Sequence, residues 1–409
     1  MPRTSSDGQS IRVLMLTQYP RTPEEERLGG IMQASFRLVQ ALARAQVPNL
    51  KLCVITESDG VRSRESRRLT ETVEVCFFPK RSSLLNAISF EYANGLRALK
   101  YGKHAFMPDL IHVQGKVNYL LAGSFVNGVP SVSTIHGIFR NEMKVVNSRP
   151  GLRGLIKKQI KIGLESLYTS RMKNLIAITD EVEAFARERS KEVRVYRINN
   201  PIDEAFFELK PLTENTDCTI LFVAAITYRK GLDFLLKAMV TVLKELPHVK
   251  LRIAGIWDWD PVYVSNLKTE YSRYIEAGSI AFLGGIAQDQ LLQEMENSLL
   301  LCLPSRAESA PMVIAQALAA GRPVIASDVG GIPGMVREGV TGRLWEVGSA
   351  DSLATLISSL VKNRPLAMKM GIQARLDALR KYSSEGIARA TVEAYQEIVS
   401  LKAGDSSAS

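Results

Sequence analysis

Short apolar runs alternate with longer segments of mixed polarity along the first half of the chain. Between the runs, apolar residues recur every three or four positions, which is typical of amphipathic helices, whereas the runs themselves are typical of buried strands. The expected strands lie at 11–17, 50–56, 73–78, 109–113, 131–135, 174–179 and 194–198, and the expected helices at 31–44, 84–101 and 151–170. Strands that alternate with helices in this way predict a parallel sheet covered on both faces.

The alternation restarts after a polar stretch at residues 209–217. Five further apolar runs lie at 218–226, 249–255, 280–285, 298–305 and 323–327. They predict a second doubly wound sheet, and sheets of this kind bind ligands at the rim formed by the carboxyl ends of their strands. The predicted fold class is therefore α/β, with two Rossmann-like domains.

The length of 409 residues supports two domains rather than one core. We expect a first domain over residues 1–205, a second over 206–383, and a closing segment over 384–409. An amphipathic helix at 384–401 opens this segment after a serine that can cap it. We expect that helix to pack back on the first domain and to be followed by a disordered tail.

Cysteine usage and the amino-terminal residues bear on the compartment. The four cysteines, Cys53, Cys76, Cys218 and Cys302, are far apart in the sequence and form neither a metal-type pair nor a disulfide framework. The polar start MPRTSSDGQS lacks the apolar stretch of a secretory signal, and no apolar run approaches the ~18 residues of a membrane span. We therefore expect a cytoplasmic protein.

Positive charge is concentrated in the first half of the chain. Residues 1–200 hold 31 Lys and Arg against 18 Asp and Glu, a net of +13, whereas the remainder holds 21 against 24, a net of −3. This asymmetry indicates an anionic partner, which is a membrane surface, a nucleic acid or an acidic substrate. A nucleic acid is disfavoured because the basic residues lack interleaved aromatics. The basic groups are Arg62, Arg64, Arg67, Arg68, Lys80, Arg81 and the segment 151–168.

The segment 151–168 combines basic residues at Arg153, Lys157 and Lys161 with an apolar stripe. The stripe comprises Leu152, Leu155, Ile156, Ile160, Leu164 and Leu167. This periodicity is more typical of a helix whose stripe faces the core than of a membrane-surface helix. Together with the charge asymmetry, it leaves peripheral docking on the inner face of the cytoplasmic membrane open.

The segment 304–342 carries the clearest candidate chemistry. Glu308 lies in a loop directly after an expected strand, and Pro311 is placed to open a helix. Backbone N–H groups at that helix start, and in the loop around Gly330 and Gly331, can cradle a diphosphate. Gln316 lies eight residues beyond Glu308, or roughly 12 Å along a regular helix, so the two side chains can contact different parts of one long ligand.

These residues resemble glycosyltransferase family 4, which has the GT-B fold of two Rossmann-like domains facing each other across a cleft. The resemblance covers nearly the whole chain, and its motifs are concentrated in residues 218–345. It implies that Glu308 lies near the hydroxyls of the transferred sugar. Gln316 stands where the family has a second glutamate that bonds the nucleotide ribose, and an amide can make the same bond. The donor contacts implied between these two residues are Ser309, Ala310, Pro311, Met312 and Val313.

The segment TYRKGLDFLLKAM supplies the cations of the same resemblance. Lys230 matches the family lysine that neutralises the departing diphosphate, at a helix start suited to anions. The arginine that the family usually has near position 225 is Ala225 here. Arg229 is our candidate for its substitute.

Four residues of the first half also match family positions. Gly29 and Gly30 resemble the glycine-rich turn through which the backbone approaches the donor phosphates or the reacting sugar. They do not form G-x-G-x-x-G, which argues against a nicotinamide enzyme. His136 matches the histidine that lines the cleft near the sugar, and Asn200 matches the interdomain segment N-G-x-D.

The pair Asp258 and Asp260 forms a D-x-D, the spacing that holds a divalent metal in the other major glycosyltransferase fold. It lies in an expected variable loop, and a lone D-x-D is a weak signal. We expect no metal site and no cofactor, the nucleotide-sugar being a substrate.

The resemblance implies a retaining glycosyltransferase that moves a sugar from a nucleotide-diphosphate sugar to a glycan or lipid-linked acceptor. Polysaccharide assembly for the cell envelope, including lipopolysaccharide, or for the cell exterior is the expected setting. A sugar-nucleotide epimerase is the first alternative, because such enzymes also use two Rossmann-like domains. A non-catalytic nucleotide-sugar-binding protein is the second, suggested by Ala225 and Gln316.

Overall fold

The computed structural model divides the chain into two compact units, and each is described by itself. The first comprises Met1–Phe139, Pro150–Pro201 and Ser384–Ser409, and the second comprises Arg140–Arg149 and Ile202–Ser383. The structure describes residues 10–22, 29–47, 49–80, 92–115, 117–143, 145 and 152–407.

The first unit is built around an eight-stranded sheet. Its strands are β1 (Ile11–Leu16), β2 (Leu50–Ser58), β3 (Glu65–Arg68), β4 (Val73–Pro79), β5 (Leu110–Gln114), β6 (Ser131–Ile135), β7 (Asn174–Ala177) and β8 (Arg194–Arg197). They follow the order β3-β4-β2-β1-β5-β6-β7-β8, and every described pair is parallel except β3 with β4. The strands at the centre are apolar and buried on both faces, as their uninterrupted runs predict.

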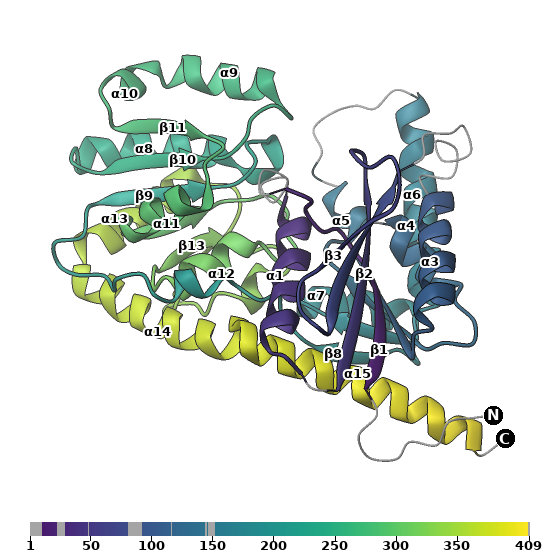
Figure 1. The fold of residues 1–409 in the computed structure, drawn as a ribbon. Coiled ribbons are helices and arrows are strands. Elements are labelled where there is room, and N and C mark those ends of the chain that lie inside the picture. Colours follow the sequence, from purple (N-terminus) through teal and green to yellow (C-terminus); the bar gives the residue numbers. More distant parts are fainter. Residues whose placement is uncertain are drawn as a thin grey trace. The chain divides into compact units, whose positions relative to one another are not determined.

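Helices cover both faces of this sheet. They are α1 (Gly30–Arg44), α3 (Tyr92–Phe106), α4 (Val117–Ser124), α6 (Leu152–Ser170), α7 (Asp180–Arg189) and α15 (Ser384–Ser407), and the short α5 (Phe139–Glu142) follows β6. Helix α15 packs on α1 and β5, whereas α3 packs on α4 and α4 on α6 (Figure 1). This arrangement is the covered parallel sheet that the sequence predicts.

The closing helix α15 contributes to the core of the first unit. Tyr395 is fully buried, and its hydroxyl lies 2.6 Å from Nδ1 of His112, whose Nε2 lies 2.8 Å from the Thr134 hydroxyl. Burial, and to a lesser degree the nearby His136, lower the pKa of His112 to about 3. His112 is therefore neutral at physiological pH and ties the closing helix to β5 and β6 by hydrogen bonds.

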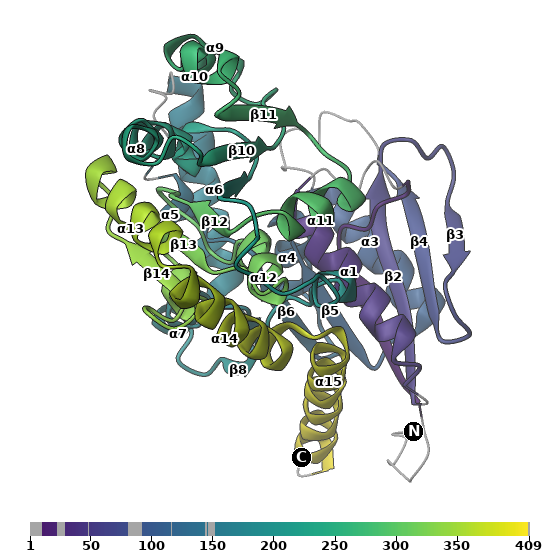
Figure 2. The ribbon, with the colours of Figure 1, turned by 90° about the vertical axis from the view of Figure 1, so that its left-hand side faces the viewer.

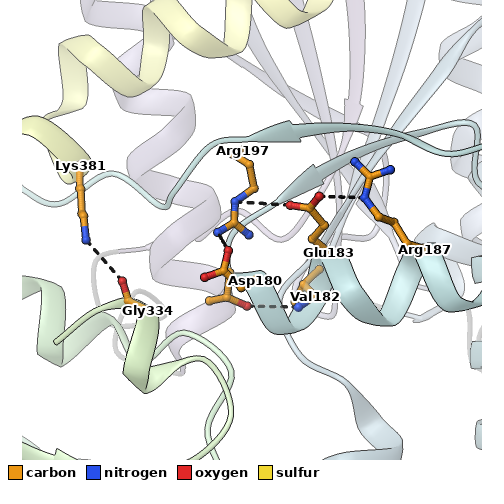
Figure 3. A network of polar contacts seen from close by, with 8 residues as sticks. Asp180, Val182, Glu183, Arg187, Arg197, Gly334 and Lys381 are labelled. Carbon is orange, nitrogen blue, oxygen red and sulfur yellow. Dashed lines mark hydrogen bonds and ion pairs between the residues drawn. The ribbon is translucent and has the colours of Figure 1, made fainter. Parts of the chain in front are cut away.

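Charged side chains link α7 to the edge strand β8 (Figure 3). Arg197 pairs with Asp180, and its Nε lies 3.7 Å from Glu183, which also accepts a hydrogen bond from Arg187 at 2.8 Å. The Thr179 hydroxyl caps the start of α7 by accepting from the Val182 amide. Part of the positive charge of the first unit is therefore balanced within it.

The second unit contains a six-stranded sheet in which every described neighbouring pair is parallel. Its strands are β9 (Thr219–Val223), β10 (Lys250–Ala254), β11 (Ile280–Gly284), β12 (Leu300–Leu303), β13 (Val324–Ser327) and β14 (Gly342–Trp345). They follow the order β11-β10-β9-β12-β13-β14. The prediction of two Rossmann-like α/β cores is therefore confirmed.

The helices of the second unit lie on both faces of its sheet (Figure 2). They are α8 (Leu232–Glu245), α9 (Pro261–Glu270), α10 (Ser272–Glu276), α11 (Gln288–Glu296), α12 (Met312–Ala319), α13 (Ala350–Lys362) and α14 (Arg364–Tyr382), with 3-10 turns η2 (Glu204–Phe206), η3 (Tyr228–Lys230) and η4 (Ile332–Gly334). Helix α8 packs beside α13, and α12 packs beside α14.

A buried arginine fixes one end of the α11 and α12 helices. Arg322 is 1% exposed and donates to the carbonyls of Met295 and Ala320 at 2.9 and 3.0 Å, among others. Burial lowers its pKa to about 10, so the guanidinium stays charged at neutral pH and neutralises orphan carbonyls at the helix ends.

The helix expected at 84–101 is described only from Tyr92, as α3, and residues 84–91 and Arg81 lie outside the described residues. Three features of the fold differ from the sequence expectations. Strand β3 was not predicted, because all four of its residues are polar and exposed, and it pairs antiparallel with β4 at the edge of the first sheet. Strand β14 was also missed. The apolar stripe of α6 is largely exposed rather than turned to the core.

Candidate active site

Strands β9 and β12 are neighbours in the second sheet although β10 and β11 separate them in the chain. The chain therefore leaves β9 toward one edge of the sheet and resumes at β12 toward the other. Such a reversal opens a crevice at the carboxyl ends of the two strands, where doubly wound sheets bind ligands. The loop after β9 carries Lys230, and the loop after β12 carries Glu308.

Gly231 brings the first loop close to the second. It follows the turn η3, has a left-handed φ of 69°, and caps the start of α8. A Cβ at this position would lie 1.9 Å from the carbonyl oxygen of Pro304. Only glycine allows this backbone approach, and it sets Lys230 beside the β12 loop.

Glu308 is the centre of a cluster of polar side chains. It is 7% exposed and pairs with Lys230. The guanidinium of Arg229 lies 3.4 Å from Oε2 of Glu308 and donates to the Ala307 carbonyl at 2.9 Å. The Ser305 hydroxyl donates to Oε1 at 2.9 Å. The structure therefore brings together three of the predicted residues and adds Ser305.

The cluster keeps Glu308 ionised. Burial alone would raise its pKa, but the charges of Lys230 and Arg229, together with the bonds from Lys230 and Ser305, outweigh burial and hold the pKa below its ordinary value. At neutral pH Lys230 and Arg229 thus share one carboxylate, so the three side chains together carry a net charge of +1. The two cations can attract an anion, and the Glu308 carboxylate can accept a hydrogen bond from a hydroxyl group.

The loop around Gly330 differs from the expectation of free amides. The Gly331 amide donates to the Glu308 carbonyl at 3.2 Å, and the amides of Asp328 and Ile332 donate to carbonyls of Trp345 and Val329. The Gly331 amide thus ties the loop to Glu308, and these three amides are engaged within the protein rather than free. Gly330 has a left-handed φ of 55°, as a glycine turn requires.

Gln316 lies on α12, half-buried. Only part of the interval from Glu308 is helical, because α12 begins at Met312 with Pro311 as its cap, so the spacing of roughly 12 Å stays a prediction. The remaining predicted donor contacts, Ser309, Ala310, Pro311, Met312 and Val313, form the loop and first turn between the two side chains.

Comparison with known proteins identifies the family. The profile of the group 1 glycosyl transferases matches residues 204–377, and that of Glycosyltransferase Family 4 matches residues 28–206. The two matches together run from the first unit through most of the second. The chain belongs to glycosyltransferase family 4.

Two proteins of similar sequence are named as a glycosyltransferase and a synthase. An uncharacterised glycosyltransferase of Methanocaldococcus jannaschii is 32% identical over 178 residues, which are 43% of the transferase and 44% of that relative. The N-acetyl-alpha-D-glucosaminyl L-malate synthase of Bacillus anthracis is 26% identical over 306 residues, 71% of the transferase and 75% of the synthase. The transferase thus spans less than half of the first relative and three quarters of the second.

Solved structures show the fold of the transferase. Sucrose-phosphate synthase of Thermosynechococcus elongatus has a TM-score of 0.77 at 18% identity, covering 96% of the transferase and 100% of the synthase. Anabaena HepE, crystallised with UDP-glucose, has a TM-score of 0.70 at 20% identity, covering 95% of the transferase and 100% of HepE. Their architecture is GT-B, and the transferase has this fold.

The predicted residues of the first unit also follow strands. Gly29, with a φ of 147°, caps α1 after β1, and Gly30 is the first residue of α1. His136 follows β6, where Nε2 lies 3.4 Å from Oε1 of Gln114, and burial lowers its pKa to about 4. The ring is therefore neutral at physiological pH. Asn200 is half-buried in the loop after β8.

The D-x-D has a structural role in the transferase. Asp260 caps α9 by accepting from the Tyr263 amide at 3.4 Å, and Asp258 is exposed. Over the described ranges, no group of three His, Cys, Asp or Glu residues is placed to hold a metal. Of the helices that the structure describes, none combines the length and apolarity needed to cross a bilayer.

Two charged residues of the transferase's site were missed from the sequence. Arg306 lies in the loop after β12 and Asp233 in the first turn of α8, and their side chains pair. Arg306 stands two residues before Glu308 and Asp233 three residues after Lys230, so proximity to the motif was the available signal. Single charges at a helix start or in a loop are more often solvated, which hid the pair.

Proposed function

We propose that this transferase moves a sugar from a nucleotide-diphosphate donor to a glycan or lipid-linked acceptor, with retention of configuration and without a metal ion. The observation that carries the proposal is the net-positive cluster of Lys230, Arg229 and Glu308 at the switch point of the second sheet. The HepE structures contain UDP or UDP-glucose, which supports a nucleotide-sugar donor.

The charges of the cluster suit the departure of a diphosphate. Lys230 and Arg229 would stabilise the negative charge that develops on the leaving group, the role that family resemblance assigns to Lys230. Glu308, kept ionised, would accept hydrogen bonds from hydroxyls of the transferred sugar rather than act as an acid. Gln316 would bond the ribose. The departing phosphate would itself take the acceptor's proton, so the proposal requires no separate protein base.

We assign the acceptor to the first unit. From the same unit, Gly29 and Gly30 would let the backbone approach the donor phosphates or the reacting sugar, and a neutral His136 can exchange hydrogen bonds with a hydroxyl of that sugar. Asn200, in the loop after β8, would contribute a polar side chain to the donor. Assembly of cell-envelope or extracellular polysaccharide remains the proposed setting.

The proposal includes docking of the first unit on an anionic membrane surface. Helix α6 exposes Leu155, Ile156 and Ile160 by 46%, 53% and 43%, beside the exposed Lys157 and Lys161. The one acidic residue of α6, Glu165, is buried and accepts from the Phe139 amide. An exposed face of apolar and basic side chains is typical of a helix that lies on anionic lipid.

The arginines near β3 contribute less to such a surface because they are partly used within the unit. Arg67 donates to the Arg21 carbonyl at 3.1 Å and lies over the Phe77 ring, and Arg64 lies over the ring of Tyr101. Helix α6 is therefore the element to which we assign the docking.

Product analysis tests the transferase proposal. The full chain is incubated with UDP-, GDP- and ADP-sugars and lipid extract, with and without EDTA, and the products are analysed by mass spectrometry and NMR. We expect a new glycosidic bond with retained configuration and nucleoside diphosphate release that survives EDTA. An epimerised free nucleotide-sugar would favour the epimerase, and donor binding without turnover would favour the binding protein.

A further inference from the structure

Arg306 and Asp233 connect the two loops that carry the cationic cluster. Nη1 and Nη2 of Arg306 donate to the two carboxylate oxygens of Asp233 at 2.8 and 2.6 Å. The two side chains are 10% and 30% exposed, so this bidentate pair is mostly shielded from water. Two parallel bonds fix the orientation of the guanidinium as well as its distance.

The same arginine holds the backbone of the turn η3 at two points. Its Nη1 donates to the Tyr228 carbonyl at 2.7 Å, and its backbone amide donates to the Arg229 carbonyl at 2.8 Å. Its guanidinium also lies over the ring of Tyr228, 3.7 Å from the centroid. Arg306 thus contacts both residues that precede Lys230.

Asp233 is fixed from the opposite side. The Tyr263 hydroxyl donates to its Oδ1 at 2.7 Å, and its own amide donates to that hydroxyl at 3.1 Å. Burial alone would raise the pKa of Asp233, but the bonds from Arg306 and Tyr263 and the charge of Arg306 hold it below the ordinary value. The pair is therefore ionised at neutral pH.

We propose that Arg306 and Asp233 are positioning residues for the transfer, which hold Arg229 and Lys230 where the leaving diphosphate is stabilised. The inference rests on the proposed function. The pair anchors η3 from the loop of Glu308, so the cations and the carboxylate keep their mutual distance. Catalysis by fixed charges requires such preorganisation, because a cation that must reorient stabilises the transition state less.

The substitution Arg306→Lys tests the pair, since it keeps the positive charge but removes the two-pronged guanidinium and its contact with the Tyr228 ring. We expect Arg306→Lys to lower kcat/KM by about 10- to 100-fold, mainly through kcat, since a misplacement of ~1 Å costs about 100-fold. Inorganic pyrophosphate can serve as a probe of the diphosphate site because it does not require the nucleobase of the donor to be known. Its inhibition of Arg306→Lys should be weaker than its inhibition of the wild type. Asp233→Asn should show the same pattern, and the double variant should lose little more than either single variant.

Arg252→Lys is the matched control. Arg252 forms another bidentate pair of the second unit, with Glu294, on β10 and α11 rather than in the loops after β9 and β12. Equal losses of kcat/KM in Arg306→Lys and Arg252→Lys, or an unchanged kcat in Arg306→Lys, would overturn the positioning role. Amide hydrogen exchange at residues 228–231 supplies a readout without turnover: exchange should accelerate in Arg306→Lys and not in Arg252→Lys. If the wild type transfers no sugar, the proposed function fails, whereas unchanged exchange overturns the positioning role by itself.

Discussion

At the scale of single residues, Gly231 determines whether Lys230 can lie beside Glu308. Its left-handed backbone and its distance from Pro304 leave no room for a side chain. Ser305 and Arg229 then complete the contacts of the carboxylate. The site thus depends on backbone conformation as much as on the charged groups that it displays.

We predict that Gly231→Ala destabilises the protein more than Gly339→Ala and abolishes most transferase activity. Both glycines are left-handed, at 69° and 71°, so both variants lose about 1–2 kcal/mol from the backbone conformation. Only the alanine at 231 meets a backbone atom, whereas nothing lies within 4 Å at 339. Urea unfolding with the donor assay measures both effects, and equal losses in the two variants would contradict this account of Gly231.

Lys230 and Glu308 could be identified from the sequence because each follows an apolar run within a few residues of a recognisable motif. The Arg306–Asp233 pair could not, because no motif assigns either residue a role and single charges at a helix start or in a loop are more often solvated. Two of the amides expected to be free near Gly330 are bonded instead: Gly331 donates to Glu308 and Asp328 to Trp345, acceptors that other loops and strands supply.

At the scale of elements, hydrophobic periodicity predicted the parallel strands well and the environment of α6 poorly. A stripe of apolar residues has the same pattern whether it meets a core or stays exposed. Strand β3 was missed because its four residues are polar and exposed. Its pairing with β4 is a tertiary contact that alternation of apolar residues does not signal.

We predict that α6 directs binding to anionic vesicles. Lys157→Glu with Lys161→Glu should weaken binding to phosphatidylglycerol-containing vesicles by roughly 30-fold or more, since each lysine contributes about 1 kcal/mol. Lys51→Glu with Lys191→Glu changes the net charge equally at other exposed positions of the first unit and should have little effect. Cosedimentation provides the measurement. Equal losses in both double variants would assign the binding to net charge, and no vesicle binding by the wild type would refute docking.

At the scale of the whole molecule, the two parallel sheets and the family 4 assignment agree with a glycosyltransferase of the GT-B fold. The sequence predicted the two α/β cores because each repeats the same alternation of strand and helix. It left the donor base, the sugar and the acceptor open, because these depend on loop shapes that the fold does not determine.

The central claim is that Lys230 and Glu308 act together on a nucleotide-sugar in the full chain. The most direct measurement is nucleoside diphosphate release by Lys230→Ala, Glu308→Gln and the control Lys244→Ala, which removes an exposed lysine of α8. We expect kcat/KM to fall by about 100- to 1,000-fold in Lys230→Ala, the effect of losing one donor to a developing anion. The kcat/KM of Glu308→Gln should also fall strongly, and that of Lys244→Ala should equal the wild-type value. Activity within about two-fold of the wild type in both site variants would contradict the account, because fixed charges at this site would then not stabilise the transition state.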